Sequence, residues 1–109
     1  MGCFVAPVTS AIAAGCASSW LDKYRRPLQR LSICEGLVGL LSACEHVYHG
    51  EVTASWPFLT GLATEQTREV LMQEIATEGV MLALAGVALW TVWSVGLALY
   101  HRQHRAAVR

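Results

Sequence analysis

The sequence predicts an all-α fold: a bundle of three transmembrane helices with the N-terminus outside the cell and the C-terminus inside. The first observation is that residues 79–100, GVMLALAGVALWTVWSVGLALY, contain no charged side chain. At about 1.5 Å per residue, this run is long enough to cross a hydrocarbon core of about 30 Å. The second is composition, because 54% of the 109 residues are apolar and only 15% are charged. This balance is typical of an integral membrane protein.

The third observation is the segregation of charge along the chain. The lysines and arginines concentrate in residues 23–30 and in the tail, residues 102–109, whereas most acidic residues lie in residues 45–78. Because cytoplasmic loops carry an excess of basic residues, both basic blocks are expected on the inner side. Two inner blocks require an odd number of spans before the first, and the charge-free N-terminal segment supplies one. We therefore expect a multi-pass protein of the inner (plasma) membrane, with spans at about residues 4–21, 27–49 and 78–100.

The first predicted helix is built largely from small residues and starts near Pro7, a residue suited to a first helical turn. Small side chains spaced four apart allow helix backbones to approach closely in lipid. This helix is therefore expected to pack against other helices. The two ladders of small residues are Ala6, Ser10 and Ala14, and Ala11, Gly15 and Ser19.

The second predicted helix begins near Pro27 and stops near Gly50, a natural C-terminal cap. The segment of about residues 50–77 is expected outside, as a loop followed by a helix. Nothing breaks the helical pattern between Thr64 and Gly79, so one long helix over residues 64–101 is expected, with its first part projecting from the bilayer.

Two alternatives concern the N-terminal segment and the cysteines. The sequence around Cys16 faintly resembles a lipoprotein cleavage box, but the segment lacks the positively charged start of a signal peptide. The four cysteines form no C-x-x-C pair, and we interpret them as buried, inert thiols rather than disulfides or metal ligands.

The second helix carries a polar stripe. At about 100° per residue, Glu35, Ser42, His46 and His49 share one side of the helix. Such a stripe should face the bundle interior, another subunit or a water-filled cavity, because polar groups are costly in lipid.

The outer end of this stripe predicts a metal site. His46 and His49 lie at i and i+3, with Glu45 beside them, while Glu74 and Glu78 lie at i and i+4 on the third helix. Because the second and third helices are antiparallel neighbours, these imidazoles and carboxylates are expected at one depth. They would suit Zn²⁺, Mn²⁺ or iron. Haem is disfavoured, because only one helix offers intramembrane histidines.

Two other functions stay open. The stripe could serve only helix packing, in a structural accessory subunit. Alternatively, Glu35 and Ser42 could form part of a proton or ion path. An ionised Glu35 within the membrane would be costly, so it is either protonated or paired. Arg30 could reach toward it, and the candidate donors on the third helix are Trp90, Trp93 and Ser94.

Several functions are excluded or disfavoured. The net charge of zero excludes a basic nucleic-acid footprint. Neither a glycine-rich phosphate loop nor a Ser/His/Asp arrangement is present, so hydrolase or kinase chemistry of the soluble type is not expected. A membrane enzyme using a metal-bound water stays open. The expected partners are the lipid bilayer and either further copies of the chain or other membrane subunits. Residues 45–52, EHVYHGEV, and 71–80, LMQEIATEGV, resemble small, uncharacterised bacterial integral membrane proteins. That resemblance implies no activity.

Overall fold

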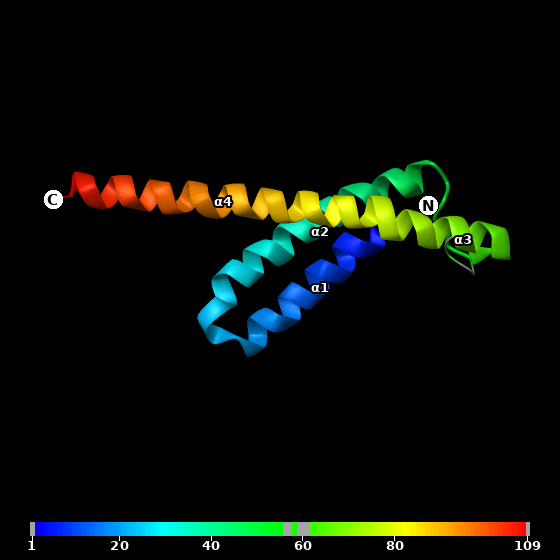
Figure 1. Cartoon of the computed structure of the whole chain (residues 1–109), viewed down its shortest axis with the longest axis horizontal. Coiled ribbons are helices and arrows are strands. Elements are labelled where there is room, and N and C mark those ends of the chain that lie inside the picture. The colour runs from blue at the N-terminus through cyan, green and yellow to red at the C-terminus, as the bar shows by residue number, and fades with distance from the viewer. Residues whose placement is uncertain (1, 56–57, 59–61, 109) are drawn as a thin grey trace.

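The protein is all-helical, as predicted. The computed structural model describes residues 2–55, 58 and 62–108 (Figure 1). Helix α1 (Val5–Trp20) leads through a short 3-10 turn, η1 (Asp22–Tyr24), into α2 (Arg25–Tyr48). After the loop come α3 (Glu65–Glu74), a π-helical segment η3 (Ile75–Gly79) and α4 (Val80–Ala107). The predicted external segment includes residues 56–57 and 59–61, which lie outside the described residues.

The last three elements form one continuous helix of 43 residues, Glu65–Ala107. It confirms the predicted long helix and runs the length of the molecule, whose longest extent is 65 Å (Figure 1). Thr64 begins it with a reciprocal cap, in which Thr64 Oγ1 accepts from Thr67 N–H and Thr67 Oγ1 accepts from Thr64 N–H. Of the described residues, only this helix is long and apolar enough to cross a membrane. The three-span arrangement and its orientation stay predictions.

Helices α1 and α2 form an antiparallel hairpin held by small residues. Gly39 lies against Val8, and a Cβ added at Gly39 would come within 2.7 Å of Val8 Cγ2. One turn earlier on α2, Gly36 faces Ala11, whose carbonyl oxygen accepts a 2.7 Å hydrogen bond from Ser32 Oγ. The small residues of α1 therefore pack as the spacing predicted.

The hairpin packs against the long helix, and Glu35 lies where the helices meet. Glu35 is completely buried, and a Cβ added at Gly86 of α4 would lie 2.7 Å from its carboxyl carbon. Ser10 of α1 lies beside the same carboxyl group. Trp90, predicted as a donor to Glu35, instead donates through Nε1 to the Pro27 carbonyl oxygen at 2.9 Å. This bond fastens α4 to the start of α2.

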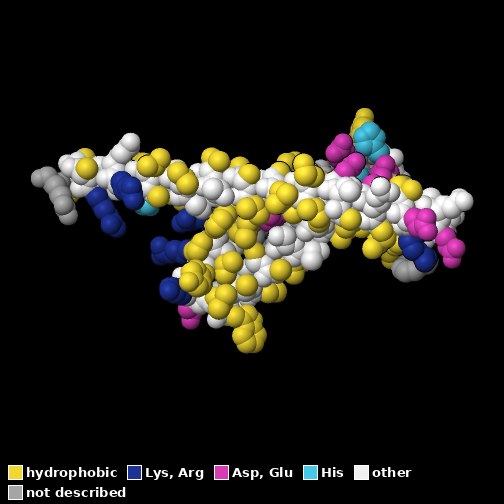
Figure 2. Space-filling model, viewed as in Figure 1, with side chains coloured by type: hydrophobic (Ala, Val, Ile, Leu, Met, Phe, Trp, Pro, Cys, Tyr) yellow, Lys and Arg dark blue, Asp and Glu magenta, His cyan; other side chains and the backbone are white. Residues whose placement is uncertain are grey.

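The surface separates by charge along the molecule. Figure 2 shows hydrophobic side chains over α1, α2 and the middle of α4, with most lysines and arginines at the end that holds the α1–α2 turn and the C-terminal tail. Carboxylates and imidazoles gather mainly at the other end, around the end of α2 and the start of the long helix. This separation agrees with the segregation seen in the sequence.

Candidate functional site

The end of α2 is shaped by a glycine-dependent cap. Gly50 has φ +71°, a left-handed conformation that glycine adopts without steric cost. Its N–H donates to the Val47 carbonyl at 3.1 Å, and the N–H of Glu51 donates to the His46 carbonyl at 2.9 Å. These two bonds are those of a Schellman motif. The motif turns the chain back and brings Glu51 over the last turn of α2, beside His46.

A chain of hydrogen bonds links four side chains at this end of the molecule. Glu51 Oε2 lies 2.5 Å from His46 Nδ1, and His46 Nε2 lies 2.7 Å from the sulfur of Cys3. Cys3 Sγ is in turn 3.2 Å from Ser42 Oγ. Because an ionised carboxylate only accepts hydrogen bonds, Nδ1–H of His46 is the donor and Nε2 is left as acceptor for the Cys3 thiol. Ser42 then donates its hydroxyl hydrogen to the sulfur.

The imidazole ring of His46 is held in place by contacts on several sides. The Phe4 ring packs against the His46 ring with a centroid separation of 5.6 Å, and only 12% of the His46 side chain is exposed. The hydrogen bond from His46 holds the pKa of Glu51 below its usual range. This bond therefore stabilises the fold above the ordinary carboxyl pKa of about 4.3, and the contribution is lost as pH falls through the lower folded pKa.

Cys3 is held immediately before α1 by close backbone packing. Gly2 lies against Leu71 and Ile75 of the long helix, and a Cβ added at Gly79 would come within 2.9 Å of the Cys3 carbonyl oxygen. Cys3 itself is 8% exposed. The sulfur therefore lies beside both the start of α1 and the His46 ring.

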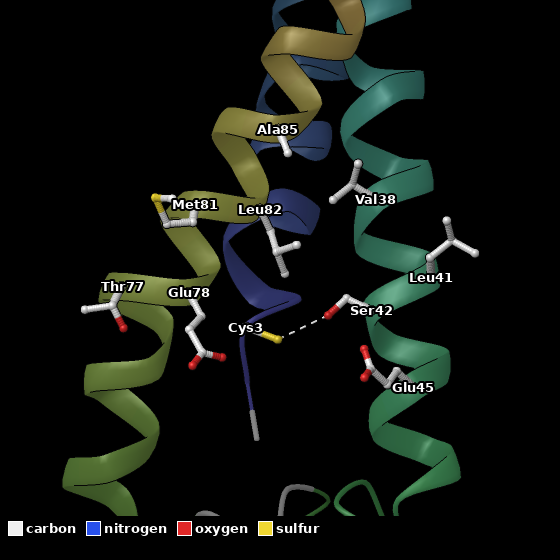
Figure 3. Close-up of a pocket in the computed structure, with 10 residues that line it drawn as sticks. All are labelled: Cys3, Val38, Leu41, Ser42, Glu45, Thr77, Glu78, Met81, Leu82 and Ala85. Carbon is white, nitrogen blue, oxygen red and sulfur yellow. Dashed lines mark hydrogen bonds between the residues drawn. The ribbon is translucent and has the colours of Figure 1, made fainter.

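A groove between α2 and the long helix opens beside the sulfur. It encloses about 720 Å³. Its polar end holds Cys3 and Ser42, with Glu45 of α2 and Glu78 of η3 on either side (Figure 3). The rest of the lining is mainly apolar, formed by Val38, Leu41, Met81, Leu82 and Ala85, together with Thr77. The π-helical segment that carries Glu78 belongs to a class of helix distortion often found at functional sites.

The predicted metal ligands are distributed differently from the expectation. Both ring nitrogens of His46 are hydrogen-bonded, and His49 is exposed, with its ring edge against Tyr48. Glu45 and Glu78 line one groove, but Glu74 does not line it. The pairing of Glu74 with Glu78 assumed regular α-helical spacing, and the π-helical segment changes that register. Within the described residues, no three His, Cys, Asp or Glu side chains could together hold a metal ion.

The predicted proton path has a gap. Ser42 belongs to the hydrogen-bonded chain near the C-terminal end of α2, whereas Glu35 lies two turns away in the helix crossing. Between them, Gly39 is covered by Val8. Neither Glu35 oxygen has a hydrogen bond of good geometry within the described part of the chain. The two residues are therefore not linked by side-chain hydrogen bonds among the described residues.

Sequence reasoning did not identify Cys3, which it grouped with the inert thiols. Cys3 and His46 are 43 positions apart, so no local motif links them. The predicted antiparallel packing of the first two helices could have indicated this contact, because the start of one antiparallel helix lies beside the end of the next. Of the other cysteines, Cys34 is buried and Cys16 and Cys44 are exposed, and all four are free.

Comparison with known proteins adds nothing to this geometry. No family model, curated protein or solved structure matches the chain. The feature that bears on function is the arrangement of Cys3, His46 and Glu51 beside the groove.

Proposed function

We propose that this protein is a three-span membrane protein that presents a reactive thiol, Cys3, at the outer ends of its helices. The observation that carries the proposal is the ordered chain Glu51–His46–Cys3, which ends at the groove. A nucleophile hydrogen-bonded to a base, with the base oriented by a third group, is the arrangement that activates thiols in covalent catalysis.

The chemistry assigned to each group follows from its bonds. His46 Nε2 accepts the thiol proton, which leaves the sulfur as a thiolate. Glu51 stabilises the resulting imidazolium through Nδ1–H, and Ser42 donates to the thiolate. Because the thiolate is the reactive form of cysteine, the site would act on an electrophile that enters along the groove.

Exposed apolar side chains support the placement of the helices in a membrane. The helix packing leaves large apolar side chains exposed on all three helices, including Ile12, Leu40 and Val92. Lipid, or further subunits of an oligomer or larger complex, would cover these side chains. The inner part of the polar stripe, around Glu35, then serves helix packing.

The test compares alkylation rates in purified protein reconstituted into lipid nanodiscs. A variant that retains only Cys3 is treated with a small maleimide at pH 7, and the adduct is followed by intact mass. His46→Gln is expected to slow alkylation of Cys3 by about tenfold or more, since it removes the proton acceptor. His101→Gln, in the tail at the opposite end, is the matched control and should leave the rate unchanged.

A variant that retains only Cys44 supplies the reference rate for an exposed thiol on α2. Cys3 is expected to react faster than Cys44 despite its burial. Equal rates for the His46→Gln and His101→Gln proteins, or slower reaction of Cys3 than of Cys44, would reject an activated thiol. Circular dichroism and gel filtration establish that the variants are folded.

Metal binding is the second candidate, because Glu45 and Glu78 line the same groove as Cys3 (Figure 3). A thiolate, an imidazole and carboxylates are ligands suited to Zn²⁺, Mn²⁺ or iron. Binding would require these side chains to come closer together than they lie in this structure, and His46 to exchange one of its hydrogen bonds for the ion. Elemental analysis of the parent beside a His46→Ala/His49→Ala double variant tests this. Near-stoichiometric metal in the parent alone supports the site, and none in the parent rejects it.

A further inference from the structure

The groove between α2 and the long helix has the form of a lipid site. We infer that it holds one acyl chain of a membrane lipid whose headgroup carries a primary ammonium group. The inference rests on the proposed membrane placement and names the class of molecule that reaches the thiol. The volume of the groove, about 720 Å³, lies within the range of sites that enclose small ligands.

The apolar part of the groove is open toward the surrounding hydrocarbon. Leu41 is 71% exposed and Met81 68% exposed, on opposite walls. From Glu45 to Val38 on α2, the helix rises about 10 Å. A groove that starts at the membrane boundary therefore extends about a third of the way into a hydrocarbon core of about 30 Å. A lipid chain can enter from the side without leaving the bilayer.

The polar end selects the headgroup by charge. The carboxylates of Glu45 and Glu78 stand on opposite walls (Figure 3). Both are exposed, and neither makes an ion pair or hydrogen bond within the described part of the chain. Two carboxylates at the mouth attract an ammonium group and repel an anionic headgroup. Phospholipids with an ethanolamine headgroup are therefore favoured over phospholipids with a glycerol headgroup.

This orientation has a consequence for the thiol. A lipid's ester groups lie between its chains and its headgroup. In this orientation the acyl chain of the lipid lies beside Val38 and Ala85, and its ammonium group lies between the two carboxylates. The ester group of the lipid then lies beside Cys3 and Ser42. The groove would thus bring a carbonyl carbon, an electrophile, to the sulfur.

The test uses two photoactivatable phospholipids with the same diazirine-bearing chain, one with an ethanolamine headgroup and one with a glycerol headgroup. Each is present at a low fraction in nanodiscs of zwitterionic phosphatidylcholine, which has no net charge. We expect the ethanolamine probe to crosslink to Leu41 and Met81, and to do so more efficiently than the glycerol probe. Glu45→Gln/Glu78→Gln should lower that preference by about fivefold or more.

Ala85→Phe fills the apolar end of the groove, where Ala85 is exposed and its replacement meets open space. It should reduce crosslinking to Leu41 several-fold. Ala98→Phe, an exposed position further along α4 and outside the groove, is the matched control. Crosslinks spread evenly over the exposed apolar surface, or a preference for the glycerol headgroup, would overturn the inference.

Maleimide alkylation of Cys3 is measured in the same Ala85→Phe protein. Retained reactivity with lost crosslinking supports a lipid groove beside an independent thiol site. In the protein without Ala85→Phe, headgroup-selective crosslinking together with a Cys3 that reacts no faster than Cys44 would reject the thiol proposal and leave the lipid site standing. The two proposals therefore fail separately.

Discussion

The two ends of the polar stripe on α2 illustrate different uses of buried polar side chains. Toward the middle of the molecule, Glu35 is completely buried against Gly86, without a hydrogen bond of good geometry within the described residues. At the C-terminal end of α2, both ring nitrogens of His46 are bonded, to Glu51 and to Cys3. The stripe is continuous in the sequence, but its two ends have different surroundings.

The difference follows from what packs against each end. Glu35 is enclosed by three helices and forms no ion pair among the described residues. An ionised carboxylate without a partner is costly to bury. The packing around Glu35 therefore suits the neutral acid. At the C-terminal end of α2, the chain reverses at Gly50 and the carboxylate of Glu51 lies beside the imidazole of His46. Polar groups there are oriented by one another, which is the requirement for proton transfer.

The largest expected effect comes from breaking the inner region. Gly86→Leu places side-chain carbons where the Glu35 carboxyl group lies, so α2 and α4 must separate. We expect a loss of about 3 kcal/mol or more of unfolding free energy, at the upper end of the cost of overpacking. Thermal unfolding in detergent measures it. Gly96→Leu is the control, because no atom within 4 Å would meet a Cβ there, and equal destabilisation of both variants would contradict the model of a tight crossing.

A pair of substitutions at Glu35 sharpens the interpretation of its charge. Glu35→Ala leaves a cavity, with an expected cost of about 2 kcal/mol. Glu35→Gln keeps the volume and the neutral state, and is expected to change stability by less than about 1 kcal/mol. Proton flux into liposomes is measured on the same proteins. Loss of a measurable flux in a stable Glu35→Gln variant would instead support the proton-path hypothesis.

The smallest effect is expected at the cap that Gly50 forms at the C-terminal end of α2. Gly50→Ala forces a side chain into the left-handed conformation at a cost of about 1 kcal/mol. The cap orients Glu51, so alkylation of Cys3 should also slow, by about threefold. Chemical denaturation and the maleimide assay measure the two effects. If stability falls while the alkylation rate is unchanged, Glu51 does not orient His46 through this cap.

The sequence predicted the features that depend on neighbours along the chain. Local patterns predicted three features of the fold. These are the glycine at the end of α2, the start of the long helix at Thr64 and the small-residue face of α1. The polar stripe was also legible, because helical periodicity places Glu35, Ser42 and His46 on one side of α2. Capping and periodicity act over a few residues, so they survive in a single sequence.

Tertiary structure alone decided how the stripe is used. The rotation of each helix about its axis placed Gly86 against Glu35 and directed Trp90 to the Pro27 carbonyl rather than to Glu35. The π-helical segment changed the register between Glu74 and Glu78. The approach of Cys3 to His46 depends on antiparallel packing across 43 positions. These contacts arise from all three helices fitting at once, and no local pattern encodes that fit because small residues permit several close approaches.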